Sequence, residues 1–257
     1  MHPTPCPGDA TLRQRLSRPR FVSAAGLSHP GLVRPTNEDA YAVRPDLGLF
    51  VVADGMGGHA AGEVASHMAI DTLADVLEHP DGLSGLPLLM AAVQRASACI
   101  RAAARADAAK EGMGTTLTAL LVLQDRTAIA HVGDCRAYHL RGRRLHRVTE
   151  DHTLVAALHS RGLMNAEETE VSDYRHLLLR ALGTEDEVTV DGRLLAVEPG
   201  DTLLLTSDGV HGVVSEEDIV AILTDERDQT GAAHRLIASA NEAGGPDNAT
   251  VVIVRVG

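Results

Sequence analysis

Short apolar runs alternate with longer amphipathic stretches along the chain. The short runs, bounded by turn residues, predict strands over 21–28, 39–44, 48–53, 115–123, 126–133, 135–141, 144–148, 188–197, 201–206 and 248–255. Apolar residues at helical spacing predict helices over 60–78, 87–109, 152–161, 215–224 and 229–243. In the first of these helices Ala61, Val64, Ala65, Met68, Thr72 and Val76 fall near one face. Strands, two central helices, further strands and then more helices predict an α+β layered domain.

Two segments depart from this pattern. Residues 1–20 contain four prolines and four arginines and few large apolar residues, which predicts a flexible N-terminal arm. Residues 162–176 are polar and broken, which predicts a mobile flap. No internal repeat or low-complexity linker divides the rest, so we expect one domain over 21–257.

Composition narrows the class of protein. Of the 257 residues 44% are hydrophobic, 23% are charged and 2% are aromatic. The core must therefore be aliphatic, and the scarcity of aromatic residues argues against a base-stacking platform for single-stranded nucleic acid. A net charge of −12 also disfavours nucleic acid. Three widely spaced cysteines form neither a disulfide framework nor a zinc motif. With no membrane-length apolar run and no secretory signal, we expect a cytoplasmic protein with no membrane partner.

The acidic residues show the clearest chemical pattern. Asp54, Asp134, Asp208 and Asp247 each lie at the end of a predicted apolar strand, beside small or turn-forming residues. Any one of them alone fits an ordinary turn. Four that converge at one edge of a layered domain would repel one another unless a cation lay between them. Oxygen ligands without a His or Cys cluster favour a hard ion such as Mg²⁺ or Mn²⁺.

A glycine-rich run directly follows Asp54. Residues 55–60, GMGGHA, satisfy the weaker dinucleotide-binding pattern GxGxxA. However, the carboxylate of Asp54 would face the pyrophosphate, and no parallel strand with a terminal acid follows the helix. Small residues here agree better with a backbone carbonyl that approaches a cation closely. A dinucleotide-binding enzyme remains a minor alternative.

Eight short motifs together resemble a known family. They are GLVRPTNEDA (31–40), VVADGMGGH (51–59), GTT (114–116), HVGDCRAY (131–138), DHT (151–153), RALG (180–183), TSDGV (206–210) and PDNAT (246–250). In this order and spacing they resemble the metal-dependent Ser/Thr protein phosphatases, the PPM or type 2C family, in its bacterial branch. The resemblance covers nearly the whole chain from about residue 22. It implies a four-layer α-β-β-α sandwich of two antiparallel sheets flanked by helices.

The resemblance also implies a site that holds two ions, Mn²⁺ or Mg²⁺. Asp54 would bridge them and the carbonyl of Gly55 would bind one of them, while Asp208 and Asp247 would hold the other. The remaining acids would act around these ligands: Glu38 and Asp39 mainly through bound waters, and Asp134 at a third, weaker metal shared with Asp208.

The implied reaction is hydrolysis of phosphoserine and phosphothreonine on proteins. A water that bridges the metals would attack phosphorus in line, and Arg34 would grip the phosphate oxygens through paired hydrogen bonds. No covalent phosphoenzyme is needed, so neither Cys135 nor Ser207 is assigned as a nucleophile. The implied partners are a bacterial Ser/Thr kinase and its substrates, and the implied state is a monomer.

Three residues qualify this interpretation. Met56 stands where many eukaryotic members have a histidine proposed as the general acid, and His59, three residues on, is interpreted as structural. Cys135 stands where the family often has serine, and we interpret it as a small buried residue. A catalytically inactive phosphoprotein-binding module on the same fold is the main alternative, although the intact ligand set argues against it.

Overall fold

The computed structural model describes residues 22–57, 61–124 and 126–257. The predicted arm over 1–20 and the predicted structural role of His59 therefore lie outside the described residues. Among the helices that are described, none combines the length and the apolar character needed to cross a bilayer.

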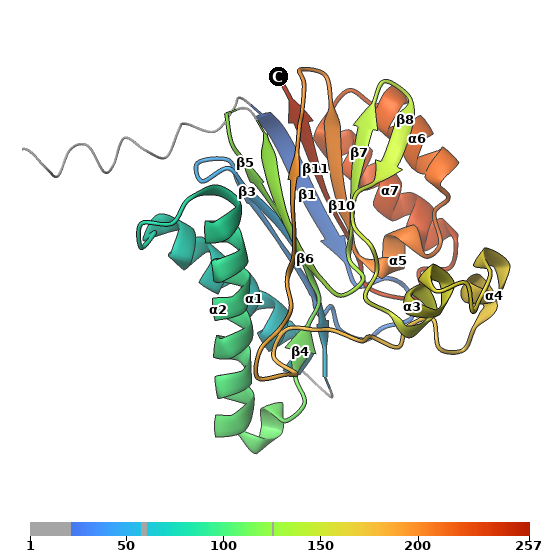
Figure 1. Ribbon diagram of the computed structural model, residues 1–257. Coiled ribbons are helices and arrows are strands. Elements are labelled where there is room, and N and C mark those ends of the chain that lie inside the picture. Colours follow the sequence, from blue (N-terminus) through green and yellow to red (C-terminus); the bar gives the residue numbers. More distant parts are fainter. Residues whose placement is uncertain (1–21, 58–60, 125) are drawn as a thin grey trace, which may run out of the picture.

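Two antiparallel sheets form the centre of the molecule (Figure 1). The first has the order β1 (Val22–His29), β11 (Ala249–Val256), β10 (Thr202–Thr206), β7 (Arg136–Arg141), β8 (Arg144–Arg147). The second has the order β2 (Asp39–Arg44), β3 (Leu49–Met56), β5 (Leu117–Val122), β6 (Thr127–Val132), β9 (Asp191–Leu195). The short strand β4 (Gly114–Thr115) extends the second sheet by pairing with the end of β3.

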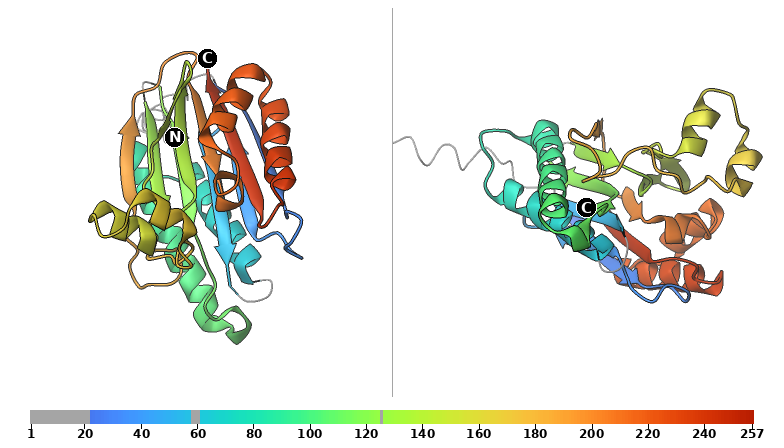
Figure 2. Two further views of the ribbon diagram at one scale, coloured as in Figure 1. Left: turned by 90° about the vertical axis from the view of Figure 1, so that its right-hand side faces the viewer. Right: turned by 90° about the horizontal axis from the view of Figure 1, so that it is seen from below.

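Helices cover the outer face of each sheet (Figures 1 and 2). The pair α1 (Ala61–Glu78) and α2 (Gly85–Ala106) packs on the second sheet, and the pair α6 (Glu216–Asp225) and α7 (Gln229–Glu242) packs on the first. Between the sheets lies a core of aliphatic side chains with Phe50 among them. This arrangement confirms the predicted four-layer sandwich and its aliphatic core.

One end of the sandwich carries additional short helices. They are α3 (Leu154–Ser160), α4 (Ala166–Val171) and α5 (Asp208–His211), and η1 (Ala108–Lys110) is a 3-10 turn after α2. Helix α4 lies inside the 162–176 segment, which the sequence predicts as a mobile flap. It begins with a capping box, in which the side chain of Asn165 accepts the N–H of Glu168 at 2.9 Å and the Glu168 carboxylate accepts that of Asn165 at 2.8 Å.

Three local predictions need correction. Strand β3 does not end before Asp54 but continues to Met56, because its last residues pair with β4. The predicted strand 115–123 is broken at Thr116 into β4 and β5. The buried face of α1 is formed by Ala61, Gly62, Ala65, Ser66, Ala69, Leu73 and Leu77, so it is rotated from the predicted face toward small residues that let the helix lie close to the sheet.

Candidate functional site

Two carboxylates face each other across neighbouring strands of the second sheet. Asp54 of β3 is directly opposite Asp39 of β2, an arrangement in which like charges destabilise each other. Asp39 is only 4% exposed, and this burial raises its pKa to about 8. Desolvation, together with the charges of Asp39, Asp208, Asp134 and Asp247, raises the pKa of Asp54 well above its ordinary value. The predicted acids therefore do share one electrostatic environment.

The first sheet contributes Asp208 and Asp247. Asp208 opens α5 directly after β10, and Asp247 lies two residues before β11. The Oδ2 of Asp247 accepts a hydrogen bond from Arg34 Nη2 at 2.8 Å, and its Oδ1 accepts the N–H of Asn248 at 2.9 Å. The Oδ1 of Asp208 is buried without a hydrogen-bond partner in the described residues. These two acids reach the site from the opposite layer to Asp39 and Asp54.

Asn248 attaches the loop that carries Arg34 and Glu38 to the start of β11. Its Oδ1 accepts the N–H of Glu38 at 2.8 Å, and its Nδ2 donates to the carbonyls of Pro30 at 3.0 Å and Thr36 at 2.8 Å. Burial raises the pKa of Glu38, while the charge of Arg34 opposes this shift. A single amide side chain thus fixes the loop across the site.

Gly55 is required for steric reasons. A Cβ at this position would lie 2.2 Å from the carbonyl oxygen of Gly62 and 2.6 Å from that of Glu38. The backbone N–H of Gly55 also donates to the Glu38 carbonyl at 3.2 Å. Only glycine lets the end of β3 pack this closely against the start of α1.

Asp134 joins the cluster from the turn after β6. Its pKa is raised to about 7, first by burial and then by the charges of Asp208 and Asp151. The preceding Gly133 has φ +104°, and its N–H donates to Nδ1 of His152 at 3.1 Å. The structure therefore brings Asp134 within the electrostatic reach of Asp208, as the sequence predicts.

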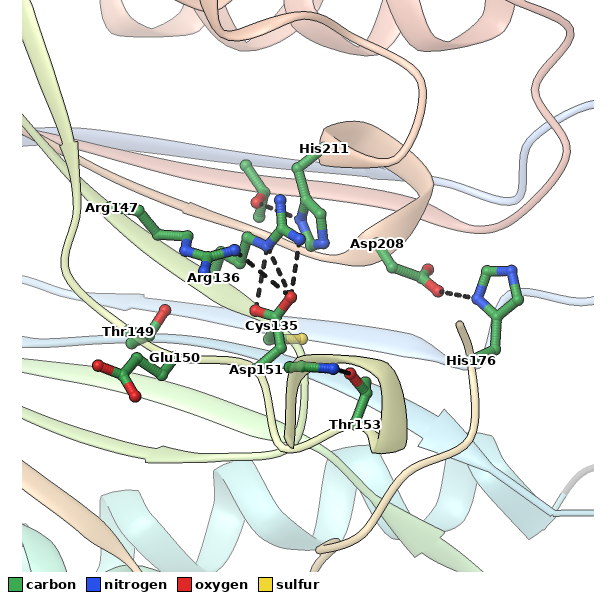
Figure 3. Close-up of polar contacts among 12 residues, drawn as sticks. Cys135, Arg136, Arg147, Thr149, Glu150, Asp151, Thr153, His176, Asp208 and His211 are labelled. Carbon is green, nitrogen blue, oxygen red and sulfur yellow. Dashed lines mark hydrogen bonds and ion pairs between the residues drawn. The ribbon is translucent and has the colours of Figure 1, made fainter. Parts of the chain in front are cut away.

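A cavity of about 1150 Å³ opens beside these acids. Arg34, Asp134, Asp208 and Asp247 line one part of it, and residues of α3 and of the 162–176 segment line another. Figure 3 shows the side of this cavity where Arg136 and Arg147 reach Asp151 and where His176 reaches Asp208. The site is thus a carboxylate cluster beside a cavity that is also lined by basic side chains.

Sequence reasoning missed two of these contacts. Nδ1 of His176 lies 3.4 Å from Oδ2 of Asp208, and this contact holds the pKa of His176 above its usual range. Arg136 Nη2 lies 2.7 Å from Oδ2 of Asp151, and both side chains are largely buried. The DHT motif contains Asp151, but nothing in the sequence pairs it with Arg136; His176 has no local signal at all.

The acids suit divalent cations held mainly by oxygen. Asp39 Oδ1 and Asp208 Oδ1 are buried oxygens with no hydrogen-bond partner in the described residues. No three His, Cys, Asp or Glu side chains within 22–57, 61–124 and 126–257 are arranged to hold one ion by themselves. Mg²⁺ and Mn²⁺ sites commonly complete their ligands with backbone carbonyls and water. Carboxylates that do not enclose an ion by themselves can therefore still hold such ions.

Comparisons with known proteins show the family to which the chain is similar. The protein phosphatase 2C family model matches residues 34–239. The serine/threonine protein phosphatase PstP of Mycobacterium tuberculosis is 43% identical over 233 residues, which cover 90% of this chain and 44% of the relative. The chain therefore spans less than half the length of that relative. The serine/threonine phosphatase stp of Listeria monocytogenes is 38% identical over 231 residues, with 87% of this chain and 92% of the relative covered.

Solved structures match over the same extent. The catalytic domain of PstP in complex with two manganese ions superposes with a TM-score of 0.81 at 41% identity, covering 91% of this chain and 98% of that one. Its two Mn²⁺ ions agree with the kind of ion that the carboxylates of this chain favour and with the number that the family resemblance implies.

Proposed function

Because the chain belongs to the protein phosphatase 2C family, we propose that it hydrolyses phosphoserine and phosphothreonine esters on proteins with the help of two divalent cations. The observation that carries this proposal is the convergence of acids from both sheets beside Arg34, at the wall of one cavity. Carboxylates that raise one another's pKa in this way are stabilised when cations bind between them.

We assign the ligands as follows. Asp54 and the carbonyl of Gly55 would hold one ion, and Asp54 would also contribute to a second ion, together with Asp208 and Asp247. When bound, the ions supply the positive charge that activates a water molecule and offsets negative charge on the phosphoryl group. Two further acids, Glu38 and Asp39, act through water molecules. Asp134 serves a third, weaker site with Asp208.

Arg34 binds the phosphate group of the substrate. Its side chain is 56% exposed and lines the cavity, and its Nη2 donates a hydrogen bond to Asp247. A guanidinium has five N–H donors in a fixed planar fork, so others stay available for two phosphate oxygens. Asp247 therefore both orients Arg34 and belongs to the cation site.

The substrate class follows from the relatives and from the shape of the site. Two relatives, 43% and 38% identical, are serine/threonine phosphatases by name. The cavity is far larger than one phosphoryl group needs, so it can admit the polypeptide on either side of the phosphorylated residue. We propose that a Ser/Thr kinase and its targets are the partners, and that the protein acts on them as a monomer.

The test measures hydrolysis by the full chain of p-nitrophenyl phosphate and of peptides carrying phosphoserine, phosphothreonine or phosphotyrosine. Each is assayed with Mn²⁺, with Mg²⁺ and with a chelator. Asp54→Asn is the site variant, and Asp71→Asn, an exposed acid on α1, is its matched control. We expect cation-dependent hydrolysis of the first two peptides, lost in Asp54→Asn and kept in Asp71→Asn.

Two results would reject the proposal. Absence of hydrolysis with either cation would favour an inactive phosphoprotein-binding module. Equal turnover in Asp54→Asn would show that the acid cluster is not the reaction site.

A further inference from the structure

Two hydroxyl groups buried between the sheets bind the carboxylate of Asp39. Oδ2 of Asp39 accepts hydrogen bonds from Ser207 Oγ at 2.7 Å and from Thr250 Oγ1 at 2.6 Å. Ser207 and Thr250 are fully buried, at 0% exposed each. Asp39 belongs to β2 of the second sheet, whereas Thr250 lies in β11 of the first sheet and Ser207 directly follows β10, so these bonds join the two layers.

Further hydrogen bonds connect Thr250 to Ser28 and Asn37. Thr250 uses its only hydroxyl proton on Asp39, so in the 2.7 Å contact between Ser28 Oγ and Thr250 Oγ1 the donor must be Ser28. Ser28 Oγ in turn accepts from Asn37 Nδ2 at 2.8 Å, and Asn37 Oδ1 accepts the backbone N–H of Asp39 at 3.2 Å. The chain of bonds therefore begins and ends on Asp39.

Both hydroxyls act on the same carboxylate oxygen. The other oxygen, Oδ1 of Asp39, is buried and has no hydrogen-bond partner in the described residues. A buried oxygen without a partner is costly unless a ligand or water completes it. Asp39 lies directly opposite Asp54 in the strand pair, so this oxygen borders the cation site.

We propose that Ser207 and Thr250 are positioning residues for Asp39: they hold its Oδ2 and leave its Oδ1 to the cation site through a water molecule. Asn37 and Ser28 orient the hydroxyl of Thr250. This inference rests on the proposed function, because it assigns the network to the cations of that site. Groups that orient a metal's ligands in this way typically change metal affinity about 10- to 100-fold when removed.

A purely structural role makes a different prediction. Bonds that only joined the two sheets would lower the stability of the metal-free protein when removed, and the affinity for cations would stay the same. The decisive quantity is therefore the dissociation constant for Mn²⁺ of the folded protein, measured by isothermal titration calorimetry beside a thermal melt of each variant.

Three substitutions at two threonines separate the hydroxyl from the rest of the side chain. Thr250→Val removes the hydroxyl at nearly constant shape, and Thr250→Ser keeps the hydroxyl without the methyl group. Thr127→Val is the matched control, because the Thr127 hydroxyl is buried in β6 without a hydrogen-bond partner in the described part of the chain. We expect Mn²⁺ affinity to fall about 10- to 100-fold in Thr250→Val and to stay near that of the unsubstituted protein in the other two.

Unchanged Mn²⁺ affinity in Thr250→Val overturns the inference. Equal losses in Thr250→Val and Thr250→Ser overturn it as well, because packing would then explain them. If Thr250→Val does not fold, Ser28→Ala takes its place: it removes the donor to Thr250 but neither donor to Asp39, and an affinity equal to that of the unsubstituted protein overturns the network. If the unsubstituted protein itself binds no Mn²⁺, the proposed function fails instead.

Discussion

The metal-free protein is expected to lose stability as the pH rises from about 6.5 to about 8. Folding raises the pKa of Asp39 to about 8 and that of Asp134 to about 7, from about 3.9 in an unfolded chain. In this interval the folded state binds more protons than the unfolded state, so the free energy of unfolding falls as the pH rises. Asp54, whose pKa is also raised, acts in the same direction.

The size of the loss follows from the pKa values of these two carboxyls. From about pH 6.5 to about pH 8, linkage assigns about 2 kcal/mol to Asp39 and about 1 kcal/mol to Asp134. For a chain of this length the total corresponds to a fall in Tm on the order of 5 to 10 °C. Buried neutral histidines such as His131, with a pKa of about 4, act in the opposite sense mainly below about pH 7, and between about pH 6.5 and pH 8 such a histidine offsets only about 0.4 kcal/mol.

Calorimetric melts at several pH values, with a chelator and with Mn²⁺, measure this effect. Asp134→Asn removes one titrating group and is expected to reduce the pH-dependent loss by about a third. Bound Mn²⁺ favours the ionised carboxylates, so the gain in Tm on adding Mn²⁺ grows with pH. A metal-free Tm that is constant or rises over this interval would refute the assignment of these carboxyls as buried and mutually repelling.

Two further substitutions test the site, and one tests the wall of the cavity. Arg34→Ala is expected to raise KM for a phosphopeptide about 10- to 100-fold with a smaller change in kcat, as loss of charge-assisted bonds to phosphate requires; steady-state kinetics measure it. Gly55→Ala forces a Cβ against the Gly62 carbonyl and is expected to cost about 1 to 3 kcal/mol in urea unfolding. Asp151→Asn leaves Arg136 without its carboxylate and is expected to cost about 3 kcal/mol in the same assay; no loss would mean that water replaces the pair.

Local patterns predicted most of the elements because each strand and helix carries its own periodicity. The acids Asp54, Asp134, Asp208 and Asp247 could be placed at strand ends for the same reason, and their convergence followed from the layered fold. The end of β3 was placed too early, because its last residues pair with Gly114 and Thr115, and such a partner far along the chain leaves no mark in the local pattern.

Other features depend on contacts between distant parts of the sequence. Ser28 and Thr250 are 222 residues apart, yet their hydroxyls touch. His176, in the 162–176 segment, and Asp208, at the start of α5, are brought together only by the tertiary fold. Periodicity reports which face of an element is buried, but not which polar side chain meets which. Hence the convergence of the acids could be anticipated and the network behind Asp39 could not.

The division of the acids between the two sheets has a consequence for folding kinetics. Asp39 and Asp54 belong to one layer and Asp208 and Asp247 to the other, so the proposed set of cation ligands is complete only after the layers have docked. A cation bound there acts as a cross-link between chain segments far apart in sequence. If these contacts are absent from the folding transition state, divalent cations leave the folding rate nearly unchanged and slow unfolding. We therefore expect the cations to stabilise the folded protein kinetically.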